Sequence, residues 1–192
     1  MGPEGLNEFS RYFYPQLDKE GLIIDDRANG GGNVSPMILE RLSREPYRLT
    51  MRRGSSLIGT VPDAVQVGPK VCLINKYSAS DGDLFPWGFR ALGLGKLIGT
   101  RTWGGIIGIS GPLPYMDGTD IRVPFFTSYD PKTGNWIIEN HGVDPDILID
   151  NDPIKEWNGE DQQLDRAIEE VMKQLKAVSY THLRAHETLA NL

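Results

Sequence analysis

The chain has 192 residues, of which 39% are hydrophobic and 24% charged, the balance of a single globular domain. Its net charge of -6 and the lack of a basic stripe interleaved with aromatic residues argue against a nucleic-acid partner, and no apolar run approaches the ~18 residues that a membrane-spanning helix needs. Cys72 is the only cysteine, which excludes an internal disulfide and a cysteine-based metal cluster.

The first quarter of the chain predicts two helices separated by a strand and a glycine turn. Apolar residues recur at helical spacing over residues 5–14, and Pro15 marks the end of this helix. Residues 22–24 form a short apolar run bounded by charges, which favours a central parallel strand. The consecutive glycines 30–32 are typical of a backbone that takes positive φ or approaches another group closely. A second helix is predicted over residues 35–43.

The middle of the chain predicts a strand, a loop and then a buried strand that leads into a hydroxyl-rich turn. Residues 47–53 alternate like an exposed strand, and residues 54–69 have the Gly, Ser, Pro and Asp content of a loop. Residues 71–76 are typical of a buried strand, and an amphipathic helix is predicted after Ser80. This order places a small hydroxyl residue between a strand end and a helix start.

Such a position is where a serine nucleophile is usually held, because backbone N–H groups of the helix N-terminus can face developing negative charge. A structural interpretation stays open, since Ser80 or Asp81 could simply cap the helix. The glycine turn and the Ser80 turn would both lie at carboxyl ends of parallel strands, where ligands bind. Together they could form an oxyanion hole; the glycine run could also be a plain tight turn, or cradle a phosphate, although it lacks the ending of a P-loop.

The second half of the chain predicts a further strand, a β-rich segment and a C-terminal helix. The strand covers residues 96–100, and short β segments with turn signals lie between residues 114 and 138. Apolar residues from 164 to 175 form one helical face. Residues 178–192 do not continue that face and resemble translated cloning sequence, so we predict one unit over residues 1–177 and a non-native-looking tail.

Four motifs in chain order resemble the tail-specific (C-terminal processing) serine peptidase family, and the last of them narrows the resemblance to its tricorn-like branch. They are residues 25–33 (Asp-Asp-Arg-Ala-Asn-Gly-Gly-Gly-Asn), 78–83 (Ser-Ala-Ser-Asp-Gly-Asp), 99–105 (Gly-Thr-Arg-Thr-Trp-Gly-Gly) and 139–146 (Glu-Asn-His-Gly-Val-Asp-Pro-Asp). The resemblance runs from about Gly2 to Lys176. It implies an α/β fold with a partial crotonase/ClpP-like β–β–α core, followed by a short β-rich segment and a C-terminal helix.

The resemblance also implies roles for individual residues. Ser80 resembles the nucleophile of a serine-type peptidase, and the N–H groups of Asp81 and Gly31 resemble the oxyanion hole. Glu139 resembles the carboxylate that orients a second serine, which in turn supports the catalytic histidine; a surface carboxylate beside a turn is the structural alternative. The implied enzyme hydrolyses peptides through an acyl-enzyme and uses no metal and no cofactor.

The chain departs from the family pattern at the general base. The processing branch has a lysine where this chain has Gly105, so a serine–lysine dyad is disfavoured and a histidine is needed. His141 is interpreted as a loop residue, and the other two histidines lie in the tail. In tricorn-like enzymes a Ser–His pair and a PDZ-like segment lie upstream, so we expect an incomplete fragment that lacks its histidine and is nearly inactive alone.

The expected partners are a peptide substrate, the upstream half of the same catalytic domain and further copies of the protein in a homo-oligomer, with neither nucleic acid nor membrane. Two other functions stay open. One is a non-catalytic module that holds peptides in the same cleft. The other is a crotonase-type enzyme acting on acyl-thioesters, against which the Ser80 turn argues, because that chemistry needs no serine nucleophile.

Overall fold

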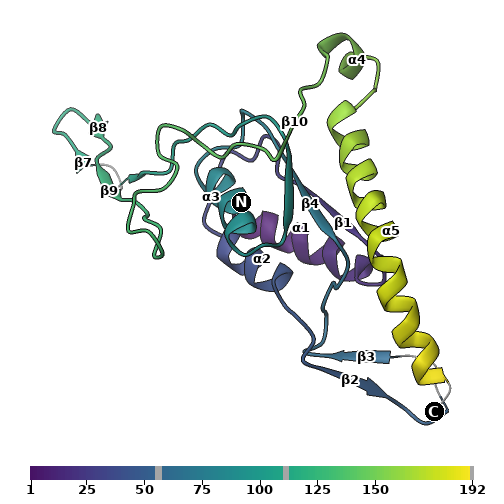
Figure 1. Cartoon of the computed structure of the whole chain (residues 1–192). Helices are drawn as coiled ribbons and strands as arrows, with labels where there is room; N and C mark the ends of the chain where they lie inside the picture. The colour runs from purple at the N-terminus through teal and green to yellow at the C-terminus, as the bar shows by residue number, and fades with distance from the viewer. Residues whose placement is uncertain (55–57, 110–112, 191–192) are drawn as a thin grey trace.

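A parallel four-stranded sheet forms the centre of the computed structural model, which describes residues 1–54, 58–109 and 113–190 (Figure 1). All three strand pairings in the sheet are parallel. From one edge to the other the strands are β1 (Leu22–Asp25), β4 (Lys70–Ile74), β5 (Gly95–Gly99) and β10 (Ile147–Leu148). The residues of β4 are all buried, as expected for a strand with a neighbour on each side and helices on both faces.

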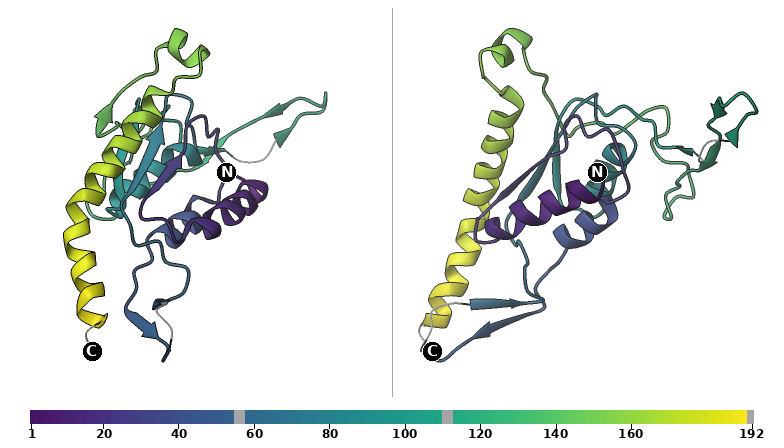
Figure 2. Two further views of the ribbon diagram at one scale, coloured as in Figure 1. Left: turned by 90° about the vertical axis from the view of Figure 1, so that its right-hand side faces the viewer. Right: turned by 180° about the vertical axis from the view of Figure 1, so that it is seen from behind.

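Helices cover both faces of this sheet (Figure 2). Successive side chains of a strand point to opposite faces, so β4 contributes to two cores. Cys72 and Ile74 belong to one core, and Val71 and Leu73 belong to the other. The helices that build the first core are α1 (Pro3–Phe13), α2 (Ser35–Leu42) and α3 (Asp81–Ala91), with a short 3-10 helix (Tyr14–Gln16) after α1; α5 (Gln162–Ala190) builds the second.

Two antiparallel segments project from this body. The first is a hairpin of β2 (Arg48–Met51) and β3 (Ile58–Val61). The second, called the arm here, comprises residues 108–109 and 113–136 and extends away from the sheet in both views of Figure 2. Its described parts contain two short ribbons, β6 (Gly108–Ile109) with β9 (Pro124–Phe126) and β7 (Leu113–Pro114) with β8 (Asp120–Ile121).

Most elements expected from the sequence are confirmed, and the α/β class with them, but two expectations were wrong. Residues 54–69 are not all loop, because Ile58–Val61 form β3; the loop-like composition of this segment hides a strand that β2 stabilises by pairing. Residues 136–138 form no strand beyond a single bridge between Tyr129 and Trp136. The backbone of residues 178–190 continues α5, while the separate, foreign character of this tail stays a prediction.

The strands β6 and β10 and the short helix α4 (Pro153–Trp157) were also not anticipated, because runs of two to five residues carry no measurable periodicity. Of the helices in the described part of the chain, none is long and apolar enough to cross a membrane.

Candidate active site

Ser80 lies at the junction of β4 and α3 in a backbone conformation that an ordinary helix cap does not need. Its φ of 57° and ψ of -115° fall in a sparsely populated region, where a non-glycine residue costs about 1–3 kcal/mol. Asp152 caps α4 in the usual extended conformation, with φ of -66° and ψ of 123°. Ser80 is also exposed, whereas Asp81 beside it is buried. The strained, exposed serine at a strand–helix turn is the geometry of a nucleophile elbow.

The glycine turn packs directly against the Ser80 turn. Ala79 N–H donates to the Asn29 carbonyl at 2.8 Å, and a Cβ on Gly82 would lie only 2.1 Å from that oxygen. Gly31 has φ of +112°, and a Cβ there would lie 2.8 Å from the Ser80 Cβ. The structure therefore brings the glycine turn and Ser80 side by side, as expected from their positions after neighbouring strands.

The two N–H groups assigned to the oxyanion hole differ in their surroundings. Within the described residues, Asp81 N–H has no hydrogen-bond acceptor and lies at the first position of α3. Gly31 N–H donates to Asn29 Oδ1 at 3.1 Å. Within these residues Asp81 N–H is thus without an acceptor, whereas Gly31 N–H already has one.

Two buried carboxylates hold the Ser80 turn in place. Asp81 accepts hydrogen bonds from the backbone N–H of Ser35, at 3.0 Å, and from its hydroxyl, which connects the turn to the start of α2. Asp83 accepts from the Ser80 N–H at 2.8 Å and from the N–H groups of Gly104 and Gly105 at 2.7 and 3.2 Å. Sequence reasoning missed Asp83, although an acidic residue three positions after a serine cap is a recognisable signal.

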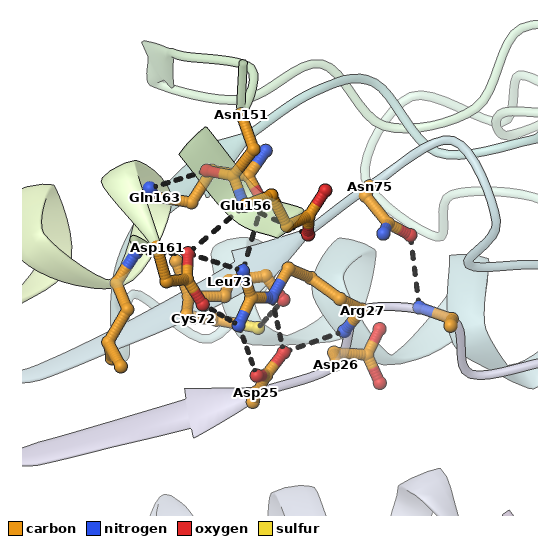
Figure 3. A network of polar contacts seen from close by, with 12 residues as sticks. Asp25, Asp26, Arg27, Cys72, Leu73, Asn75, Asn151, Glu156, Asp161 and Gln163 are labelled. Carbon is orange, nitrogen blue, oxygen red and sulfur yellow. Dashed lines mark hydrogen bonds and ion pairs between the residues drawn. The ribbon is translucent and has the colours of Figure 1, made fainter. Parts of the chain in front are cut away.

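Arg27 connects the end of β1 to the segment that precedes α5 (Figure 3). Its guanidinium donates to both oxygens of Asp25, at 2.9 and 2.7 Å, and to both oxygens of Asp161, at 2.9 and 2.8 Å. These hydrogen bonds raise the pKa of Arg27 and lower the pKa of Asp161 to about 2. On its other side this turn meets the next strand end, where Ala28 N–H donates to Asn75 Oδ1 at 3.0 Å.

Asp26, next to Arg27, is a buried carboxyl group, and one of its oxygens lacks a protein partner among the described residues. Its Oδ1 accepts from the Asn29 amide at 2.8 Å, whereas its Oδ2 is buried without a hydrogen bond. Burial, and then the nearby charge of Asp81, raise the pKa of Asp26 well above its ordinary value. Asp26 also contacts Asn29, whose backbone carbonyl accepts from Ala79 N–H, so it supports the contact between the glycine turn and the Ser80 turn.

Glu139 lies on the far side of the loop that Asp83 holds. Its Oε2 accepts from the N–H groups of Ile106 and Ile107 at 2.7 and 3.0 Å, and its Oε1 has no partner in the described part of the chain. The structure does not bring Glu139 into hydrogen-bond contact with Ser80. The half-buried carboxylate retains one oxygen that can accept a hydrogen bond from elsewhere.

No hydrogen bond in the described residues joins Ser80 to a histidine or a lysine. His141 Nε2 lies 2.7 Å from Asp144 Oδ2, and the other two histidines lie outside the residues whose side chains are described. A Cβ at Gly105 would lie 2.2 Å from Cζ3 of Trp103, so the indole fills the space that a lysine at this position would enter. Within the same residues, no cluster of three or more His, Cys, Asp or Glu could hold a metal ion.

The geometry of a nucleophile elbow has its counterpart in known proteins. The model of "Peptidase family S41" matches residues 2–149. The chain belongs to peptidase family S41. Membership confirms the resemblance to the tail-specific peptidases and its tricorn-like branch.

Individual relatives support the tricorn-like branch. The Tricorn protease of Thermoplasma acidophilum is 42% identical over 176 residues, which are 92% of this chain and 16% of that protein. Tricorn protease homolog 1 of Streptomyces coelicolor is 38% identical over 168 residues, which are 88% of this chain and 16% of that protein. The crystal structure of the tricorn protease superposes with a TM-score of 0.84 at 41% identity, over 92% of this chain and 17% of that one. The chain thus spans about one sixth of the length of these relatives.

Proposed function

We propose that this chain is the nucleophile-bearing part of a tricorn-like serine peptidase, with a crotonase/ClpP-like core, that hydrolyses peptides through an acyl-enzyme on Ser80. The observation that carries the proposal is the backbone of Ser80, an exposed serine held with φ of 57° between a buried strand and a helix. The peptide substrate is part of the same proposal, because the relatives of this chain are named proteases. A homo-oligomeric state belongs to it as well, as the resemblance of the sequence motifs implies.

In this mechanism Ser80 Oγ attacks the carbonyl carbon of the scissile peptide bond, and its proton passes to a histidine of the longer protein. The new oxyanion accepts hydrogen bonds from Asp81 N–H, which has no other acceptor in the described residues, and from Gly31 N–H once Asn29 releases it. The carbon–nitrogen bond then breaks, and the amine leaves with the proton. Water then attacks the ester carbon and gives its proton to the histidine. The bond from this carbon to Ser80 Oγ breaks, and Oγ takes the proton back.

The role of Glu139 in this mechanism is indirect. Its Oε2 is occupied by the N–H groups of Ile106 and Ile107, and its Oε1 can accept from the hydroxyl of the second serine that the tricorn-like relay requires. The carboxylate would thereby orient the hydroxyl that supports the histidine. Both partners would come from the upstream half of the domain, which is why the isolated chain is expected to be nearly inactive.

The proposal is tested in the full-length protein with a fluorophosphonate probe and a peptide substrate. Ser80→Ala should abolish labelling and lower kcat/KM by about 10³-fold or more, because the attacking oxygen is lost. Ser43→Ala, which removes a hydroxyl that donates to the Glu40 carbonyl on α2, serves as the control and should keep both labelling and activity. Retained peptidase activity in Ser80→Ala would show that the nucleophile is elsewhere.

The other two functions have distinct outcomes in the same assay. A peptide-binding module would bind the peptide in the unmodified full-length protein without labelling or turnover. A crotonase-type enzyme would bind coenzyme A thioesters and would keep its activity in Ser80→Ala. Rapid, Ser80-dependent labelling of the isolated chain would show instead that a base lies within these residues.

A further inference from the structure

Asp83 collects three backbone N–H groups from two separate segments of the chain. Its Oδ2 accepts from Ser80 and Gly105, and its Oδ1 accepts from Gly104. The side chain is completely buried, so water does not compete for these bonds. Charge-assisted hydrogen bonds of this kind are about twice as strong as neutral ones. The carboxylate therefore ties the backbone of the serine to a loop that lies more than twenty positions further along the chain.

The loop that Asp83 holds continues directly to Glu139. Ile106 and Ile107 follow Gly105 and donate their N–H groups to Glu139 Oε2, while the Gly104 carbonyl accepts from Asn140 N–H at 2.7 Å. The path from the serine to Glu139 thus consists of one carboxylate, four successive loop residues and a second carboxylate. Peptide bonds join the four loop residues, and backbone N–H groups bond to the carboxylate at each end.

The conformation of Gly104 makes this arrangement possible. Its φ is +88°, and a Cβ would lie 2.4 Å from the Gly142 nitrogen, so a larger residue does not fit at this position. Glycine adopts this conformation and directs its N–H at Asp83. Ser80 also has a positive φ, which its own side chain disfavours. The bond from Ser80 N–H to Asp83 stabilises that conformation, since a different φ would turn the N–H away from the carboxylate.

We propose that Asp83 is a positioning residue. It fixes the backbone conformation of Ser80 and the position of the nucleophile relative to Glu139. This inference rests on the proposed function, because the conformation of the Ser80 backbone affects catalysis only if Ser80 is the nucleophile. An ordinary capping carboxylate would serve its own helix alone. Asp83 instead accepts from the N–H of Ser80, the cap of its own helix, and from two N–H groups of the distant loop at once.

The test compares two carboxylates that both cap helices in the full-length protein. Asp83→Asn keeps the size of the side chain but turns an NH₂ group toward backbone N–H groups. It should lower kcat and the rate of fluorophosphonate labelling by about 10²-fold per folded molecule, with KM changed less than about threefold. Asp152→Asn is the control, since Asp152 accepts from Ile154 and Lys155 N–H on α4, away from Ser80. It should lower thermal stability with kcat unchanged.

The folded fraction of each variant is measured by circular dichroism and thermal unfolding before the rates are compared. If Asp83→Asn does not fold, Asp83→Glu, which keeps both oxygens and the charge but adds a methylene, takes its place and should show the same separation of kcat from KM. A wild-type labelling rate per folded molecule in the variant that folds would overturn the positioning role. Activity retained in Ser80→Ala would instead overturn the proposed function, so the two failures are distinguishable.

Discussion

The Ser80 turn and the arm differ in which kind of side chain they bury and which they expose. At the turn, charged groups are buried: Asp81 and Asp83 are 2% and 0% exposed, and backbone N–H groups surround them. On the arm, large apolar groups are exposed: Phe125 and Trp136 are 77% and 72% exposed. Buried, fully hydrogen-bonded charges hold one geometry, whereas short two-stranded ribbons with exposed side chains contribute little stability of their own. Sequence changes should therefore have large effects in the body and small ones on the arm.

The largest expected difference comes from one phenylalanine in each region. Phe85→Ala removes a completely buried ring on α3 and should lower the free energy of unfolding by about 3–5 kcal/mol. Phe125→Ala on β9 removes an exposed ring and should change it by no more than about 0.5 kcal/mol. Urea unfolding of the two purified variants measures both values. A large loss for Phe125→Ala would show that the arm packs against another surface in solution.

A second pair of substitutions separates backbone strain from contact with the nucleophile. Gly31→Ala places a Cβ 2.8 Å from the Ser80 Cβ at φ of +112°, so it should displace the serine and lower the labelling rate of the full-length protein by about 10²-fold. Gly118→Ala on the arm, at φ of +83°, meets no atom within 4 Å. It should cost only the backbone strain, about 1–2 kcal/mol, and leave labelling unchanged. Equal labelling rates for the two variants would contradict the position of Gly31 beside Ser80.

The smallest effect is expected from the ion pairs of Arg27, and it depends on pH. Hydrogen bonds from Arg27 lower the pKa of Asp161 from its ordinary value of 3.8 to about 2 in the folded chain. This stabilisation is complete above about pH 4 and is lost as the pH falls toward 2, because folded and unfolded chains then bind the same proton. Acid unfolding followed by circular dichroism should show that Arg27→Gln is less stable than the wild type at pH 6 but not at pH 2.

Arg122→Gln, an exposed position on the arm, provides the matched control for charge. Its stability should follow that of the wild type across the whole pH range. If the difference between Arg27→Gln and the wild type stayed constant down to pH 2, the Arg27–Asp161 pair would not be its source.

Much of the body could be predicted because its signals are local. The apolar run at 71–76 corresponds to β4, the helical spacing before Pro15 corresponds to α1, and a hydroxyl residue between strand and helix pointed to Ser80. Periodicity indicates which face of an element is buried, and the order of strand, turn and helix indicates where a nucleophile can lie. Each family motif is a short run of contiguous residues, so the sequence alone was enough to recognise it.

The sequence by itself thus determined the parallel α/β body, the Ser80 turn and membership of a peptidase family. Only the tertiary structure decided what Asp83 and Glu139 contact, because Gly104 and Ile106 reach these carboxylates from distant positions in the chain. It also decided the strained backbone of Ser80 and the pairing of β3, neither of which follows from residue type. The physical reason is that local patterns specify backbone and burial, whereas hydrogen bonds between loops depend on how the whole sheet places their ends.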